Sequence, residues 1–120
     1  MTITIGDIMS KTLETIQEKA SVQEAAKKMK ENDVSSLVVV DNQNKPQGIV
    51  TERDIVRKAC VNDIRTSVLS LREVMSSPII TIDSNESASK AVDMMLQHNV
   101  RHLLVVDKKM MMIRAANLLA

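Results

Sequence analysis

Hydrophobic positions along the chain recur in two spacings. Apolar side chains three and four residues apart form one face of a helix, and this spacing is present over residues 22–29 and again over 88–95. Continuous apolar runs at 36–40 and 103–106 are typical of strands buried on both faces, as in a parallel sheet covered by helices. The pattern therefore predicts two helices, each followed by a buried strand.

Shorter patterns complete these elements. Apolar stretches at 13–16 and 78–82 predict a brief strand before each helix, and residues 47–51 predict a further strand after the turn at 41–46. Residues 52–61 then predict a helix. Three helix starts carry a hydroxyl side chain with an acidic residue three positions on, the arrangement of a capping box: Ser21 with Glu24, Thr51 with Asp54, and Ser70 with Glu73.

The two sets of elements are copies of one unit. A shift of 66 superimposes residues 7–41 on 73–107, with 12 identities at 35 ungapped positions. Each complete copy has the order strand, helix, strand, turn, strand, helix, and neither copy alone covers its own sheet. We therefore expect an α/β (α+β) fold in which residues 1–120 form one domain. Its two pseudo-symmetric motifs would pack face to face, each a small sheet flanked by helices.

The second copy ends differently from the first. The shift places Arg114, Asn117 and Ala120 at the positions of Gly48, Thr51 and Asp54. Residues 110–120 are instead rich in strong helix formers. We expect an atypical helical tail over 110–120, and a second motif that is incomplete because it lacks its last strand and helix.

Composition argues against several classes of function. The net charge of +1, from 16 basic and 15 acidic residues, gives no electrostatic footprint for nucleic acid or an anionic membrane. Phe, Tyr and Trp are absent, so aromatic platforms for stacked bases are excluded. The single cysteine, Cys60, has no partner for an internal disulfide and belongs to no Cys/His cluster. We expect Cys60 to be a packing residue and predict no metal site.

Targeting and catalytic signals are also missing from the sequence. The N-terminus lacks the basic and apolar regions of a signal peptide, and the chain has no run of about 18 apolar residues, so we expect a cytoplasmic protein without a membrane span. The sequence has only two glycines and offers no nucleophile with a base, no paired catalytic carboxylates and no Gly-rich phosphate loop. We therefore predict no enzyme activity, no catalytic residues and no required cofactor.

A set of short segments recurs in order in both copies. In the first copy it consists of Asp7-Ile8-Met9 and residues 21–25, 34–41 and 48–55, and in the second it continues through residues 98–107. This ordered set resembles the cystathionine-β-synthase (CBS) motif. The resemblance implies a tandem CBS pair, with one motif at 5–62 and an incomplete one at 71–109. Such pairs are regulatory rather than catalytic, commonly form homodimers, and bind AMP, ADP, ATP or S-adenosylmethionine in clefts between the two motifs.

The same resemblance implies roles for residues of the first motif. In its Gly-x-x-Thr-x-x-Asp element, Asp54 would accept hydrogen bonds from the ribose hydroxyls, because a carboxylate offers two acceptor oxygens to a vicinal diol. Thr51 would donate its hydroxyl hydrogen to the ribose or phosphate. Ile49 would line the slot for the adenine ring.

The second motif would supply the other side of the same ligand. Pro78 and Ile80 would form an apolar wall and provide backbone groups for the base. Val100, Arg101 and His102 begin the central strand, where Arg101 and His102 would face the phosphates.

The mirror position holds different residues. Ser35-Ser36 stands where the second motif has Arg101-His102. We therefore expect one ligand site per chain and a degenerate second cleft.

Other interpretations of these residues stay open at this point. Thr51 and Asp54 form a helix cap whether or not they bind a ligand, and His102 can be a half-buried histidine with ordinary hydrogen bonds. His98 is expected to be exposed to solvent. A CBS pair whose sites have decayed would act instead as a ligand-independent homodimer or interaction scaffold.

Overall fold

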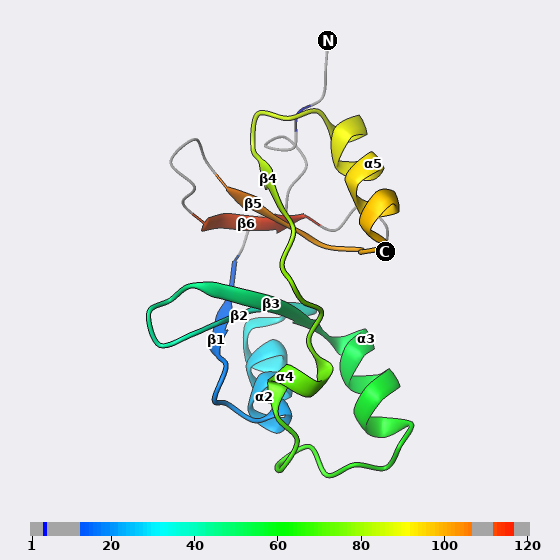
Figure 1. The fold of residues 1–120 in the computed structure, drawn as a ribbon. Helices are drawn as coiled ribbons and strands as arrows, with labels where there is room; N and C mark the ends of the chain where they lie inside the picture. The colour runs from blue at the N-terminus through cyan, green and yellow to red at the C-terminus, as the bar shows by residue number, and fades with distance from the viewer. Residues whose placement is uncertain (1–3, 5–12, 107–111, 117–120) are drawn as a thin grey trace. The chain divides into compact units, whose positions relative to one another are not determined.

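The structure, a computed structural model, describes residue 4, residues 13–106 and residues 112–116. The chain divides into two compact units, shown in Figure 1. We call residues 14–79 the first unit, and residues 1–13 together with 80–120 the second unit.

The first unit contains a three-stranded sheet with the order β1-β2-β3. Its strands are β1 (Thr15–Gln17), β2 (Ser36–Val40) and β3 (Pro46–Thr51). All three strands were predicted, but the sheet is mixed rather than parallel, because β2 pairs parallel with β1 and antiparallel with β3. The short turn between β2 and β3 explains this, since only antiparallel neighbours can be joined by so few residues.

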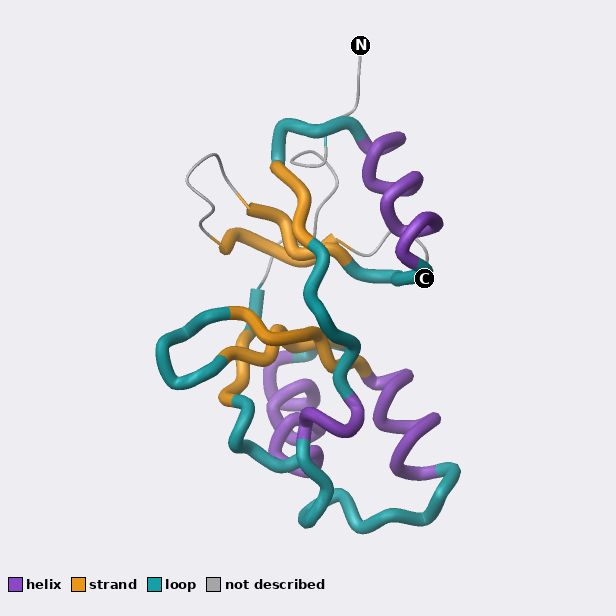
Figure 2. The backbone as a smooth tube through the Cα atoms, viewed as in Figure 1, coloured by secondary structure: helices purple, strands orange, loops and turns teal. Residues whose placement is uncertain are grey.

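Helices cover one side of this sheet (Figures 1 and 2). Helix α2 (Val22–Asn32) follows β1, and α3 (Glu52–Ile55) follows β3 directly. The chain then widens into a π-helix, η1 (Val56–Cys60), before the short helix α4 (Leu71–Val74). The predicted helix over 52–61 is therefore present, with its second half in the π form.

The core of the first unit lies between the sheet and these helices. Leu37 and Val39 of β2 pack with the predicted apolar stripe of α2, whose Val22, Ala25 and Met29 are all buried. Two further contributors, Leu71 and Val74, come from α4.

One packing prediction was wrong in this region. Cys60 is exposed, and its neighbour Ala59 takes the buried position in η1. Side chains at adjacent helical positions point in different directions, so only one of the two can face the core.

The second unit repeats the plan. Strands β4 (Thr81–Asp83) and β5 (Leu103–Val106) are parallel, and α5 (Ala88–His98) connects them. The buried core residues are Ile82, Ala91, Met95, Leu103 and Val105.

The prediction of a helical tail without a third strand was wrong over residues 112–116. These residues form strand β6 (Met112–Ala116), which pairs antiparallel with β5. Helix propensity is a weak preference that tertiary pairing overrides, and β5 offers a free edge of backbone donors and acceptors. Residues 107–111 and 117–120 lie outside the described part of the chain.

The hydrogen-bonding register follows the sequence repeat. Val39 pairs with Gly48 in the first unit, and Val105 pairs with Arg114 in the second, a shift of 66 in both strands. The β-bulge in each hairpin occurs at the same relative position, between Val39 and Val40 and between Val105 and Val106. The second sheet therefore has the same backbone arrangement as the first.

Candidate functional site

The junction of β3 and α3 carries two of the predicted ligand residues. The Thr51 hydroxyl accepts a hydrogen bond from the Asp54 amide at 3.0 Å, and the Asp54 carboxylate accepts one from the Thr51 amide at 3.1 Å. This is a complete capping box. It leaves the Thr51 hydroxyl hydrogen available as a donor and leaves the carboxylate with further acceptor positions.

Burial differs between the two side chains. Thr51 is 9% exposed, and Asp54 is half-buried. The capping box therefore fixes both side chains in place while the Asp54 carboxylate stays partly open to solvent. Such a carboxylate can accept hydrogen bonds from a polar ligand without a large rearrangement.

Ile49 lies on the same strand, next to a second segment of the first unit. Its amide donates to the Ser76 carbonyl at 3.1 Å, and the Ser76 amide donates to the Ile49 carbonyl at 2.9 Å. Pro78, exposed and joined to Ser77 by a cis peptide bond, follows two residues later. The structure thus brings the segment of Pro78 to the strand that carries Ile49 and Thr51.

The remaining predicted residues belong to the second unit. The Ile80 carbonyl accepts a hydrogen bond from the Leu104 amide at 2.9 Å, and Ile80 and Val100 both pack against the second core. Arg101 is exposed and His102 is half-buried. Both lie after the end of α5 and just before β5, which begins at Leu103 rather than at Val100 as predicted.

The mirror positions differ in chemistry. Ser35 is exposed, and its carbonyl accepts a hydrogen bond from the Glu52 amide at 3.0 Å. Asn117 and Ala120 lie outside the described residues. Gly48 in β3 corresponds in register to Arg114 in β6.

Sequence reasoning missed Ser76 in the site region, and it used Gly48 only as part of the Gly-x-x-Thr-x-x-Asp element. A glycine inside a strand is a known sign that another backbone approaches closely. That signal was present in the sequence, but it does not say which segment approaches.

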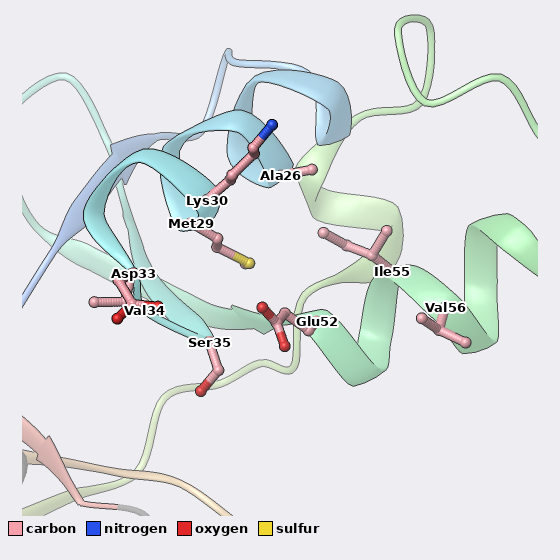
Figure 3. A pocket seen from close by; sticks show the side chains of 9 residues that line it. All are labelled: Ala26, Met29, Lys30, Asp33, Val34, Ser35, Glu52, Ile55 and Val56. Carbon is pink, nitrogen blue, oxygen red and sulfur yellow. The ribbon is translucent and has the colours of Figure 1, made fainter.

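A groove between α2 and α3 was not predicted either. It has a volume of about 710 Å³, and its walls come from both helices, from the first residue of η1 and from the residues between α2 and β2 (Figure 3). Met29 and Ile55 form buried parts of its lining, and Val56 is 54% exposed. Lys30 and Glu52 add opposite charges.

The described residues contain no group of three or more His, Cys, Asp or Glu side chains that could hold a metal ion. None of their helices is long and apolar enough to cross a membrane. His98 is exposed, as predicted.

The family follows from comparison with known proteins. The model of the CBS domain matches residues 5–60 and again residues 71–113. The chain belongs to the CBS domain family. Its two copies are therefore two CBS motifs, and tandem CBS pairs are regulatory modules.

Several known proteins resemble the chain over most of its length. The CBS domain-containing protein YhcV of Bacillus subtilis is 32% identical over 104 residues, which are 87% of this chain and 73% of that protein. An uncharacterized protein of Methanopyrus kandleri is 30% identical over 105 residues, 88% of this chain. The chain spans 54% of the length of that relative and 63% of an uncharacterized 17.7 kDa protein of Acidianus ambivalens.

A solved structure supports the fold. The CBS domain pair of protein MJ0100, in complex with 5′-methylthioadenosine and S-adenosyl-L-methionine, is 27% identical and has a TM-score of 0.79. The alignment covers 98% of this chain and 90% of that one.

Proposed function

We propose that this CBS pair is a cytoplasmic, non-catalytic sensor that binds one adenine-containing ligand per chain: AMP, ADP, ATP or S-adenosylmethionine. The observation that carries the proposal is the Thr51–Asp54 capping box, which presents a fixed, half-buried carboxylate at the end of β3. A carboxylate held in this way suits the two adjacent hydroxyls of a ribose. The adenosyl ligands of the related MJ0100 pair support the same ligand class.

The second motif contributes the groups for the rest of the ligand. Arg101 offers a planar cationic fork and His102 a further donor, which together suit a phosphate or the carboxylate of S-adenosylmethionine. Ile49, Pro78, Ile80 and Val100 are proposed to contact the base. The regulatory effect on any partner would be limited by the difference in ligand affinity between two conformations of the module.

The test compares two variants that change the same position of two capping boxes. Asp54→Asn removes the charge that is proposed to bind ribose. Glu24→Gln is the matched control, because Glu24 occupies the third helical position of α2 and accepts from the Ser21 amide at 2.8 Å. Both variants weaken a cap and should lower the melting temperature slightly.

Ligand binding separates the two variants. Isothermal titration with AMP, ATP and S-adenosylmethionine should show binding by the wild-type chain to at least one of them. Loss of a charged hydrogen bond should then weaken binding by Asp54→Asn by about tenfold or more, with no change in Glu24→Gln. No binding of any of the three at millimolar concentration, or equal effects of the two variants, would refute the proposal.

A second candidate function, a ligand-independent homodimer or interaction scaffold, is favoured by exposed apolar side chains. Val56 at the groove is 54% exposed, and Leu96 on α5 is 66% exposed. Large exposed apolar side chains on helices are common at interfaces. Sedimentation with and without AMP tests this function. A dimer whose association does not change with AMP, and which dissociates in Leu96→Glu, supports it. A monomer contradicts it.

A further inference from the structure

We propose that Gly48 is a positioning residue for the ligand site. Its missing Cβ allows Ser76 to pair with Ile49 at the free edge of β3, and this pairing restricts the position of Pro78. The inference deepens the proposed function, on which its ligand-binding part rests. Its structural part stands on contacts within the first unit alone.

Residues 75 and 76 approach Gly48 more closely than any residue with a Cβ would permit. A Cβ built on Gly48 would lie 2.6 Å from the Ser76 carbonyl oxygen and 2.9 Å from the Met75 sulfur. Real Cβ atoms essentially never come closer than 3.0 Å to such neighbours. The glycine is not required by its own backbone angles, since its φ is not positive. Its role is therefore to leave space for the neighbouring segment.

The two close contacts differ in how they could relax. The Met75 side chain is flexible and could turn away from a methyl group at position 48. The Ser76 carbonyl is backbone, and it accepts the Ile49 amide at 3.1 Å. Moving this oxygen away would break the reciprocal pair of hydrogen bonds between Ile49 and Ser76. A side chain at position 48 should therefore detach the segment from β3.

Detachment of Ser76 from β3 would change the position of a predicted ligand residue. Pro78 follows Ser76 by two residues, a reach of at most about 7 Å of extended chain, so the bridge at Ser76 restricts where Pro78 can lie. Gly48 itself precedes Thr51 by three residues on the same strand. The bridge thus connects the segment proposed to form a wall for the base with the strand that leads to the ribose-binding carboxylate.

The second motif provides a natural contrast. Its strand β6 has the same register as β3, but the position of Gly48 is taken by Arg114, a residue with a Cβ. The Gly48 position of the second motif therefore carries a side chain, and the two motifs differ in sequence there as well as at the proposed ligand-binding positions.

Hydrogen exchange tests the bridge without any ligand. In Gly48→Ala, the Ile49 and Ser76 amides should exchange at least about tenfold faster relative to the Val38 amide, which donates to the Glu14 carbonyl just before β1 at 3.0 Å. Val50→Ala is the matched control, because it removes buried side chain from the same strand without adding an atom near Ser76. It should change all three amides together. Retained protection of Ile49 and Ser76 in Gly48→Ala would overturn the inference.

Ligand titration tests the positioning role. Gly48→Ala should bind AMP or S-adenosylmethionine about tenfold more weakly, as expected for loss of one apolar wall, while Val50→Ala keeps the wild-type affinity. Ser76→Pro, which removes the amide that donates to Ile49, should reproduce the loss and serves if Gly48→Ala does not fold. Unchanged affinity in both variants overturns the positioning role alone. Absence of binding in the wild type overturns the proposed function and the positioning role together.

Discussion

Leu71 allows a direct test of how the repeat is divided between the units. By sequence it begins the second CBS match, at residues 71–113, yet its side chain is fully buried in the core of the first unit. Burying a leucine contributes about 2 kcal/mol, and the cavity left by truncation adds to the loss. We expect Leu71→Ala to lower the free energy of unfolding by about 3 kcal/mol, which corresponds to a fall of about 10 °C in melting temperature.

The location of the damage is more informative than its size. Native-state hydrogen exchange should show lower protection of the amides in β2 and β3 in Leu71→Ala. Leu103→Ala is the matched control, since Leu103 is equally buried but belongs to the core of the second unit. If Leu71→Ala weakened β4 and β5 and left β2 and β3 unchanged, the assignment of α4 to the first core would be wrong.

Two further predictions concern local interactions. The amide of Lys45, assisted by that of Gln43, donates to Asp41 and holds the pKa of its carboxyl below the usual range. The Asp41 hydrogen bonds stabilise the fold at pH values above the unfolded pKa, and this stabilisation is lost as pH falls through the lower folded pKa. Asp41→Asn removes the titrating group. Below about pH 4, its free energy of unfolding, measured by urea unfolding across pH, should therefore fall less than that of the wild type. Ser87→Ala removes the hydroxyl that accepts from the Lys90 amide at 3.1 Å and should lower the free energy of unfolding by about 1 kcal/mol in the same assay; no change would show that the cap contributes nothing.

Local sequence signals were sufficient for much of the fold. The apolar stripe of α2 and the capping box of Ser21 and Glu24 predicted a helix that begins after Ser21, and the structure places it there. The apolar run at 36–40 predicted β2. Each of these signals lies within a few residues of the element it specifies, so no knowledge of distant contacts was needed.

Features that depend on distant segments were not predicted. Residues 112–116 favour a helix by composition, but they form β6 because β5 supplies backbone partners that local propensity does not reveal. Gly48 was recognised only as part of a motif, since nothing near it in the chain indicates that Ser76 approaches it. The exposure of Cys60 depends in the same way on which side of η1 faces the core.

A symmetric backbone does not imply two equal ligand sites. Sheet pairing needs only amide and carbonyl groups, which every residue except proline provides, so β6 keeps the register of β3 although Arg114 replaces Gly48. A ligand site needs particular side chains, and the residues proposed to bind the ligand in the first motif are replaced by others at the equivalent positions of the second. The likeness of the two folds therefore does not decide the number of ligands per chain. Titration with AMP or S-adenosylmethionine should give one ligand per chain, and two equivalent sites would contradict the proposed functional asymmetry of the repeat.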